Sequence, residues 1–264
     1  MNFEQIISEY SLLTIILLAV FSFIAGFIDA VVGGGGLVIV PFFLISFPKV
    51  PMPMVFGTNK IAGFSGTALA AVKYAQRVKF DIRLLLIISI SAFIASFIGA
   101  KVVSFIPSES LKPFILIVLI LIAVHTYFKK DLGSIETKEL PFWKQALFGS
   151  LFSLVIGFYD GFFGPGTGSF FVLAFVVVLG FEFVKASAYS KVINCITNIS
   201  ALIVFIKNGQ FIIELAIIMA IFNVSGSYIG TSMALKKGND FIRTVFLVIV
   251  SLMILKYGYD VFKH

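Results

Sequence analysis

Charged side chains are scarce in this chain of 264 residues. Asp, Glu, Lys and Arg make up 12% of it, about half of their share in a soluble domain, while apolar residues make up 59% and Phe alone occurs 32 times. So few charges cannot cover a water-facing surface, which excludes a soluble enzyme, a nucleic-acid-binding domain and a disordered protein. The apolar stretches are long and continuous and do not alternate at period two, which excludes a β-barrel. The composition therefore predicts an all-α polytopic membrane protein.

Chemically reactive side chains are also few. The chain has one cysteine, Cys195, and two histidines, so it can form no disulfide within itself and no multi-cysteine metal site. It has no P-loop motif and no cluster of His, Cys and carboxylates at metal-ligand spacing. We therefore expect no cofactor, no metal, no nucleic-acid partner, no ATP-driven pumping and no enzymatic activity.

Long apolar runs dominate the sequence instead. An α-helix needs about 20 apolar residues to cross the hydrocarbon core of a bilayer. We predict about ten helical segments, over residues 12–31, 36–47, 54–75, 82–106, 111–128, 143–162, 167–180, 186–206, 211–235 and 241–261. Most can span a membrane, but 36–47 and 167–180 are short and each follows a glycine-rich break, so these two either span or are re-entrant.

The glycine-rich breaks are the most informative local feature. The first consists of Gly33, Gly34, Gly35 and Gly36, and the second of Gly164, Pro165, Gly166, Thr167 and Gly168. Glycine opposes a helix by about 1 kcal/mol per residue, and non-helical backbone at membrane depth persists only where it is buried in protein or lines a wet cavity. The breaks therefore predict a binding site, although glycines could also permit a tight hairpin or close helix packing.

The two halves of the sequence match, without a gap, in one constant register. This repeat register pairs Gly26 with Gly157, Asp29 with Asp160, Gly33 with Gly164, Lys60 with Lys191, and Ser96 with Ser227. Apolar matches mean little in so hydrophobic a chain, but polar and glycine matches in one register are hard to obtain by chance. We predict two repeats of five segments, residues 1–128 and 145–264, joined by a cytoplasmic linker over 129–144.

An odd number of segments per repeat predicts that the second repeat is inverted in the membrane. Basic residues gather in the loops at 76–83, 129–144 and 236–243, which fall on one side when the segments are counted alternately. This side is predicted to be cytoplasmic, so both termini lie outside the inner membrane of the cell. Inverted repeats are typical of secondary transporters, whose substrate site lies between the repeats near the midplane of the membrane.

Helix N-termini and lysines together predict an anion site. A helix that begins after a break presents free N–H groups and the positive end of its dipole. Lys60 and Lys191 lie at matching positions in otherwise apolar segments, where ionisable residues are functional candidates, although a lone lysine could instead snorkel to the membrane surface. Their polar neighbours could add directional hydrogen bonds to a substrate, and they are Thr58, Asn59, Tyr189, Ser190 and Asn194, with Thr197 and Asn198 further along.

Asp29 and Asp160 each precede a break by four residues. Each could pair with a lysine and keep the empty site neutral, or one could carry a proton and couple transport to the proton gradient. Each could also hydrogen-bond the backbone and shape its break.

A rival motif lies in the first half of the chain. Gly63-Phe64-Ser65-Gly66 fits the G-x-S-G pattern of rhomboid intramembrane proteases, and a serine hydrolase would need His125 within hydrogen-bond reach of Ser65. The motif is short and does not explain the repeat, so an intramembrane serine protease is the weaker interpretation.

The paired motifs resemble the TauE/SafE family of sulfite exporters. In the first half the resemblance rests on the stretch from Gly26 to Gly36, on Pro41, and on Gly57-Thr58-Asn59-Lys60. In the second half it rests on Gly157 to Gly168 and on Ala188-Tyr189-Ser190-Lys191, so it covers nearly the whole chain. The resemblance implies a secondary transporter of sulfur-containing anions such as sulfite or organosulfonates.

The sequence as a whole predicts a secondary transporter of a small anion, with alternating access around the breaks and lysines, and with proton coupling as an option. An anion channel of the same fold is the alternative. The preference for sulfur over phosphorus or carboxylate rests on the resemblance alone. Phe-rich apolar faces could be covered equally by the lipid bilayer or by a homodimer partner.

Overall fold

A computed structural model describes residues 10–106 and 140–262 of the chain. These residues fold into helices joined by short turns, and no strand occurs among them. In order along the chain the helices are α2 (Leu12–Val32), α3 (Gly36–Ser46), α4 (Met52–Ala75), α5 (Ile82–Phe105), α7 (Phe142–Phe162), α8 (Thr167–Val177), α9 (Phe183–Lys207) and α10 (Ile213–Phe262). The predicted all-α class is confirmed.

The helix ends follow local chemistry. The Ser11 hydroxyl accepts a hydrogen bond from the N–H of Thr14 (3.2 Å) at the start of α2, and the Asp81 carboxylate accepts from the N–H groups of Arg83 (3.0 Å) and Leu84 (3.2 Å) at the start of α5. Such caps satisfy N–H groups that a helix leaves free. At the other end of α2, Gly33 adopts the left-handed conformation (φ 84°), which glycine tolerates best.

The observed bounds agree with the predicted segments in most of the described chain. The segments predicted over 12–31, 36–47, 54–75, 82–106, 143–162, 167–180 and 186–206 match helices to within three residues. The last two predicted segments form α10, which is interrupted where Gly238 leaves the helical conformation (φ 73°, ψ −155°). The predicted segment 111–128, most of the predicted linker and His125 lie outside the described residues.

Five stretches of helix are long and apolar enough to cross a bilayer, namely α2, α5, α7, α9 and residues 213–238 of α10. α4 is as long as α5 but carries polar side chains along its length, and α3 and α8 have only 11 residues each. The chain is therefore a multi-pass membrane protein that also contains two short apolar helices.

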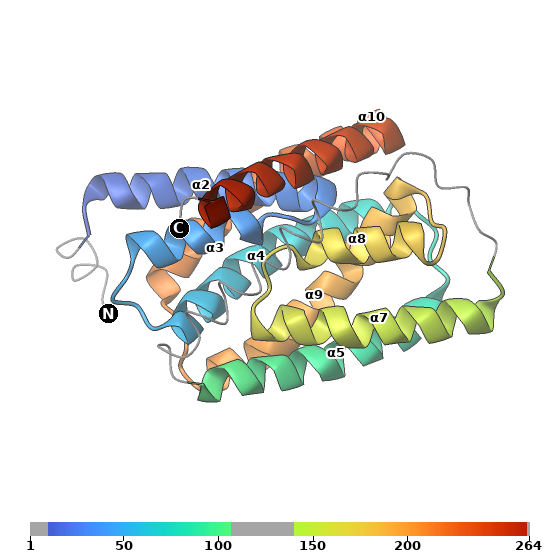
Figure 1. Ribbon diagram of the computed structural model, residues 1–264, viewed down its shortest axis with the longest axis horizontal. Coiled ribbons are helices and arrows are strands. Elements are labelled where there is room, and N and C mark those ends of the chain that lie inside the picture. Colours follow the sequence, from blue (N-terminus) through green and yellow to red (C-terminus); the bar gives the residue numbers. More distant parts are fainter. Residues whose placement is uncertain (1–9, 107–139, 263–264) are drawn as a thin grey trace.

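The outer helices pack in two pairs. α5 and α7 run side by side along one edge of the molecule, and α2 and α10 lie along the opposite edge, with α4 and α9 crossing between them (Figure 1). Small residues allow the close approach: a Cβ on Gly157 of α7 would lie 2.7 Å from the carbonyl oxygen of Ala92 in α5, and one on Gly26 of α2 would overlap the carbonyl of Asn223 in α10.

Equivalent contacts recur at positions that the repeat register pairs. The Ser96 hydroxyl of α5 donates to the carbonyl of Thr197 in α9 (2.8 Å), and the Ser227 hydroxyl of α10 donates to the carbonyl of Gly66 in α4 (2.6 Å). Helices α3 and α8 also begin and end at positions paired by the same register. Helices α2 and α4 of the first half thus pack against α10 of the second half, and α7 and α9 of the second half pack against α5 of the first. The two halves are interlocked in this way.

Candidate functional site

The two glycine-rich breaks touch each other inside the molecule. The N–H of Ser169 donates to the carbonyl of Gly33 (3.0 Å), and the Ser169 hydroxyl donates to the carbonyl of Val32 (2.9 Å). A Cβ on either Gly33 or Gly168 would overlap the backbone of the other glycine. These contacts bring the N-termini of α3 and α8 together in the interior of the fold.

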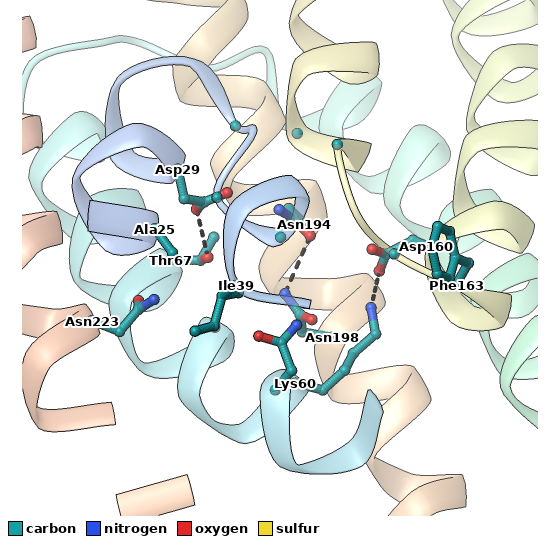
Figure 2. A pocket seen from close by; sticks show the side chains of 18 residues that line it. Ala25, Asp29, Ile39, Lys60, Thr67, Asp160, Phe163, Asn194, Asn198 and Asn223 are labelled. Carbon is teal, nitrogen blue, oxygen red and sulfur yellow. Dashed lines mark hydrogen bonds and ion pairs between the residues drawn. The ribbon is translucent and has the colours of Figure 1, made fainter. Parts of the chain in front are cut away.

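The place where the two breaks touch, at Gly33 and Gly168, is called here the crossing of the breaks. A cavity of about 50 Å³ lies beside it. Figure 2 shows Asp29 and Thr67 on one side of it, Lys60 and Asp160 on the other, and Asn194 and Asn198 between them. At about 10–15 Å³ per water it holds a few water molecules. Its lining residues come from both halves: Ala25, Asp29, Gly33, Gly35, Gly36, Ile39, Asn59, Lys60, Gly63, Thr67, Asp160, Phe163, Gly164, Gly166, Gly168, Asn194, Asn198 and Asn223.

Lys60 forms a buried ion pair with Asp160. The Lys60 ammonium, on α4, lies 2.7 Å from the carboxylate of Asp160 in the last turn of α7. The side chains are 5% and 2% exposed. Both residues line the cavity, so one face of this pair meets the space that a ligand would occupy.

Lys191 forms the matching pair with Asp29. Its ammonium, on α9, lies 3.3 Å from the Asp29 carboxylate and also donates to the Asp29 carbonyl. The same carboxylate accepts a hydrogen bond from the Thr67 hydroxyl (3.0 Å). Lys191 is fully buried and is not among the lining residues, whereas Asp29 is 17% exposed and faces the cavity. Lys191 therefore contacts a residue of the cavity lining, Asp29, but does not itself line the cavity.

Both ion pairs join one half of the chain to the other. Within each pair the lysine and the aspartate come from different halves, and the repeat register places each member of one pair opposite its counterpart in the other. The pairs make the site neutral overall. Removing one partner of a buried pair leaves an uncompensated charge, so each lysine and its aspartate depend on each other.

Side-chain amides form the rest of the polar lining. The Asn198 amide donates to the Asn194 carbonyl oxygen (3.2 Å) one turn earlier on α9. The Asn223 amide donates to the Ser22 carbonyl (3.4 Å), while its own oxygen is buried and has no hydrogen-bond partner among the residues the structure describes. The lining thus offers neutral donors and acceptors in addition to the charges.

Several residues predicted to bind substrate have other contacts and do not line the cavity. The Thr58 hydroxyl donates to the Met54 carbonyl and accepts from the N–H of Ile212, and the Tyr189 hydroxyl accepts from the N–H of Asp81. Three more hold the second break in shape: the Ser190 hydroxyl donates to the Gly168 carbonyl, the Thr167 hydroxyl to the Gly164 carbonyl, and the Pro165 carbonyl accepts from the Tyr159 hydroxyl. In the first break, the Gly34 carbonyl accepts from the N–H of Leu37.

Two polar side chains of the lining, Thr67 and Asn223, were not predicted from the sequence. Thr67 lies seven residues after Lys60, with Gly63 between them, so all three share one face of α4. Asn223 is a buried amide in the third turn of α10, directly after the apolar run 215–222. An amide that follows an apolar run in a membrane helix could have identified Asn223 from the sequence as a candidate site residue.

Ser65 of the protease-like motif does not line the cavity. Its hydroxyl donates to the Ile61 carbonyl one turn earlier (3.0 Å), a bond that serines in membrane helices commonly form. His125, its expected partner, lies outside the described residues.

Comparison with known proteins adds a family. A family model described as "Sulfite exporter TauE/SafE" matches residues 18–257. A "Probable membrane transporter protein" of Haemophilus influenzae is 34% identical over 238 residues, which are 90% of this chain and 92% of that protein. The "Probable membrane transporter protein ORF9" of a Sinorhizobium species is 35% identical over 237 residues, 89% and 88% of the two chains. The "Probable membrane transporter protein YfcA" of Escherichia coli K12 is 31% identical over 241 residues, 90% and 87% of the two chains. No solved structure matches the chain.

Proposed function

Because this chain belongs to the Sulfite exporter TauE/SafE family of membrane transporters, we propose that it is a secondary transporter of small sulfur-containing anions, such as sulfite or an organosulfonate. The observation that carries the proposal is the cavity between the two breaks, flanked by an ion pair on each side. Each pair takes its lysine from one half and its aspartate from the other.

The positive groups around the cavity support a preference for anions, since the lysines balance the carboxylates of Asp29 and Asp160 that also line it. The N-termini of α3 and α8 direct their dipoles toward the crossing of the breaks, where Gly35, Gly36, Gly166 and Gly168 line the cavity. Lys60 is the ammonium group with access to the cavity, and Asn59 and the amides of α9 can donate hydrogen bonds to anion oxygens. We therefore assign direct substrate contact to Lys60 and the positioning of Asp29 to Lys191.

The ion pairs also supply a reason for proton coupling. While Asp160 is ionised it holds the Lys60 ammonium at 2.7 Å, so an incoming anion must compete with a carboxylate for the same donor. Protonation of Asp160 removes its charge, and the Lys60 ammonium is then available to the anion. A proton that enters with an anion offsets one negative charge of that anion, which reduces the uncompensated charge buried in the site.

Alternating access is the mechanism we propose for movement across the membrane. The halves 1–128 and 145–264 would form an inverted repeat, with the linker 129–144 in the cytoplasm and both termini outside, and the equivalent packing of α2 on α10 and of α7 on α5 supports this arrangement. Opening the cavity to one side or the other would change the contacts at the crossing of the breaks. The protein would act as a carrier and not as an enzyme. A channel of the same fold would differ from it because its anion flux would not saturate and would not be coupled to protons.

An oxyanion panel tests the proposed substrate class. We expect a sulfonate or sulfite to bind purified protein more tightly than acetate or phosphate, measured by calorimetry and by thermal shift. Loss of the Lys60 charge-assisted hydrogen bond, worth about 1.5–3 kcal/mol, should weaken binding about 10- to 100-fold in Lys60→Ala. Lys191→Ala should weaken binding through Asp29. Unchanged affinity in both variants would contradict the site, and preferential binding of phosphate would contradict the sulfur assignment alone.

A further inference from the structure

A second polar pocket lies at one end of the molecule, between the end of α4 and the middle of α10. It has a volume of about 490 Å³ and is lined by Lys73, Gln76, Arg77, Ser232, Leu235 and Lys236. Three of these six side chains are cationic. Within the part of the chain that the structure describes, none of the three forms an ion pair with a carboxylate. The pocket therefore presents uncompensated positive charge.

Lys73 is held in place at the edge of this pocket. Its ammonium donates to the Ser232 hydroxyl (2.8 Å) and to the Tyr228 carbonyl (3.3 Å), and it lies 3.2 Å from the centre of the Tyr228 ring. These contacts fix the position of the ammonium between α4 and α10. Arg77 and Lys236 are exposed, so their charges can move toward a ligand.

The surface next to the pocket is apolar and exposed. On α10, Ile221, Tyr228 and Ile229 are 59%, 56% and 44% exposed, and with Ser225, Ser232 and Lys236 they follow one face of the helix. This face extends from Ile221 to Lys236, about 22 Å along the axis. In a membrane protein such a face contacts acyl chains, and here it ends at three cations.

We propose that this pocket binds the phosphate headgroup of an anionic phospholipid, with an acyl chain along the exposed face of α10. Basic pockets between membrane helices on the cytoplasmic side are suited to anionic headgroups. Its lining residues lie within or directly before the basic loops 76–83 and 236–243. These are two of the three loops that predict the cytoplasmic side. The proposal does not depend on which anion the protein transports.

The internal repeat offers a built-in comparison. In the repeat register the three cationic positions correspond to Val204, Asn208 and Phe105, at the seam between α9 and α5. That seam has its own lysines at other positions, Lys101 and Lys207. The cluster of three cations is therefore not a consequence of the repeat.

Binding of short-chain phosphatidylglycerol to the purified full-length protein tests the proposal. We expect saturable binding to wild type, and on the order of 100-fold weaker binding to Lys73→Gln/Arg77→Gln/Lys236→Gln, since each cation near an anionic headgroup contributes about fivefold. The control Lys101→Gln/Lys185→Gln/Lys207→Gln removes three charges outside the pocket and should bind like wild type. Lys236→Glu, which reverses the charge of an exposed side chain, should also weaken binding.

Two further arms identify the source of the phosphate. Short-chain phosphatidylcholine should bind weakly because it has no net charge, and inorganic phosphate at the same concentration should not compete, because it has no acyl chain. Equal binding of phosphatidylglycerol to wild type and both triple variants would overturn the proposal. Inorganic phosphate that binds as tightly as the lipid, and with the same dependence on the variants, would also overturn it in favour of a free-anion site.

Discussion

Replacing Lys60 with glutamine is expected to abolish transport and to destabilise the protein strongly. The substitution leaves the Asp160 carboxylate, which is 2% exposed, without its cation at 2.7 Å. Breaking a buried pair by removing one partner typically costs about 3–5 kcal/mol. The same change removes the ammonium group that faces the cavity. We expect a lower unfolding temperature in detergent and no uptake of anion into proteoliposomes.

A double variant separates these two effects. In Lys60→Gln/Asp160→Asn both charges are gone, and the two amides can still hydrogen-bond, so most of the lost stability should return. Anion uptake should stay absent, because the cavity still lacks the ammonium. A double variant that transports at the wild-type rate would show that Lys60 has only a structural role, and a stable single variant would show that the pair is not buried as described.

Replacing Gly33 with alanine is expected to disrupt the crossing of the breaks. Gly33 has a φ of 84°, which side chains rarely adopt, and its Cβ would overlap the backbone of Gly168. Neither backbone can retreat easily, because the N–H of Ser169 also donates to the Gly33 carbonyl. We expect loss of substrate binding and a large fall in the yield of folded protein, measured by size-exclusion chromatography and by calorimetry with the preferred anion.

Gly63→Ala is the matched control for this substitution. Gly63 also lines the cavity, but it lies in the interior of α4, and a Cβ there would meet no atom within 4 Å. Alanine favours a helix over glycine by about 1 kcal/mol, so this variant should fold at least as well as wild type. Equal behaviour of Gly33→Ala and Gly63→Ala would contradict the close contact between the breaks.

The sequence identified the parts of the site that are identical in both halves. The glycine pairs Gly33/Gly164 and Gly35/Gly166, both aspartates and both lysines were found because they recur in one register. The helix ends followed from apolar lengths and breaks. The sequence did not show that Lys60 lines the cavity and that Lys191 does not. This difference depends on how α4 and α9 are rotated about their axes, which tertiary packing decides.

The residues missed are those where the two halves differ. Thr67 corresponds to Asn198, and Asn223 corresponds to Ala92, so neither Thr67 nor Asn223 has an identical residue in the other half. Both nevertheless line the cavity. A search limited to matching residues finds the shared scaffold of the two halves and passes over positions that make the site asymmetric.

Proton movement during anion uptake is the most direct test of the coupled carrier. Proteoliposomes would contain a pH-sensitive dye and receive sulfoacetate outside, whose acidic groups are both ionised at neutral pH. We predict saturable uptake that an inward proton gradient accelerates, with acidification of the lumen in step with the anion. Asp160→Asn leaves the buried Lys60 ammonium without its carboxylate, so the yield of folded protein should fall. In the folded fraction of this variant the anion should still move down its gradient, but without protons and without pH dependence. Uptake that does not saturate and does not respond to the proton gradient would contradict the carrier and indicate a channel. A proton flux that Asp160→Asn leaves unchanged would contradict the coupling.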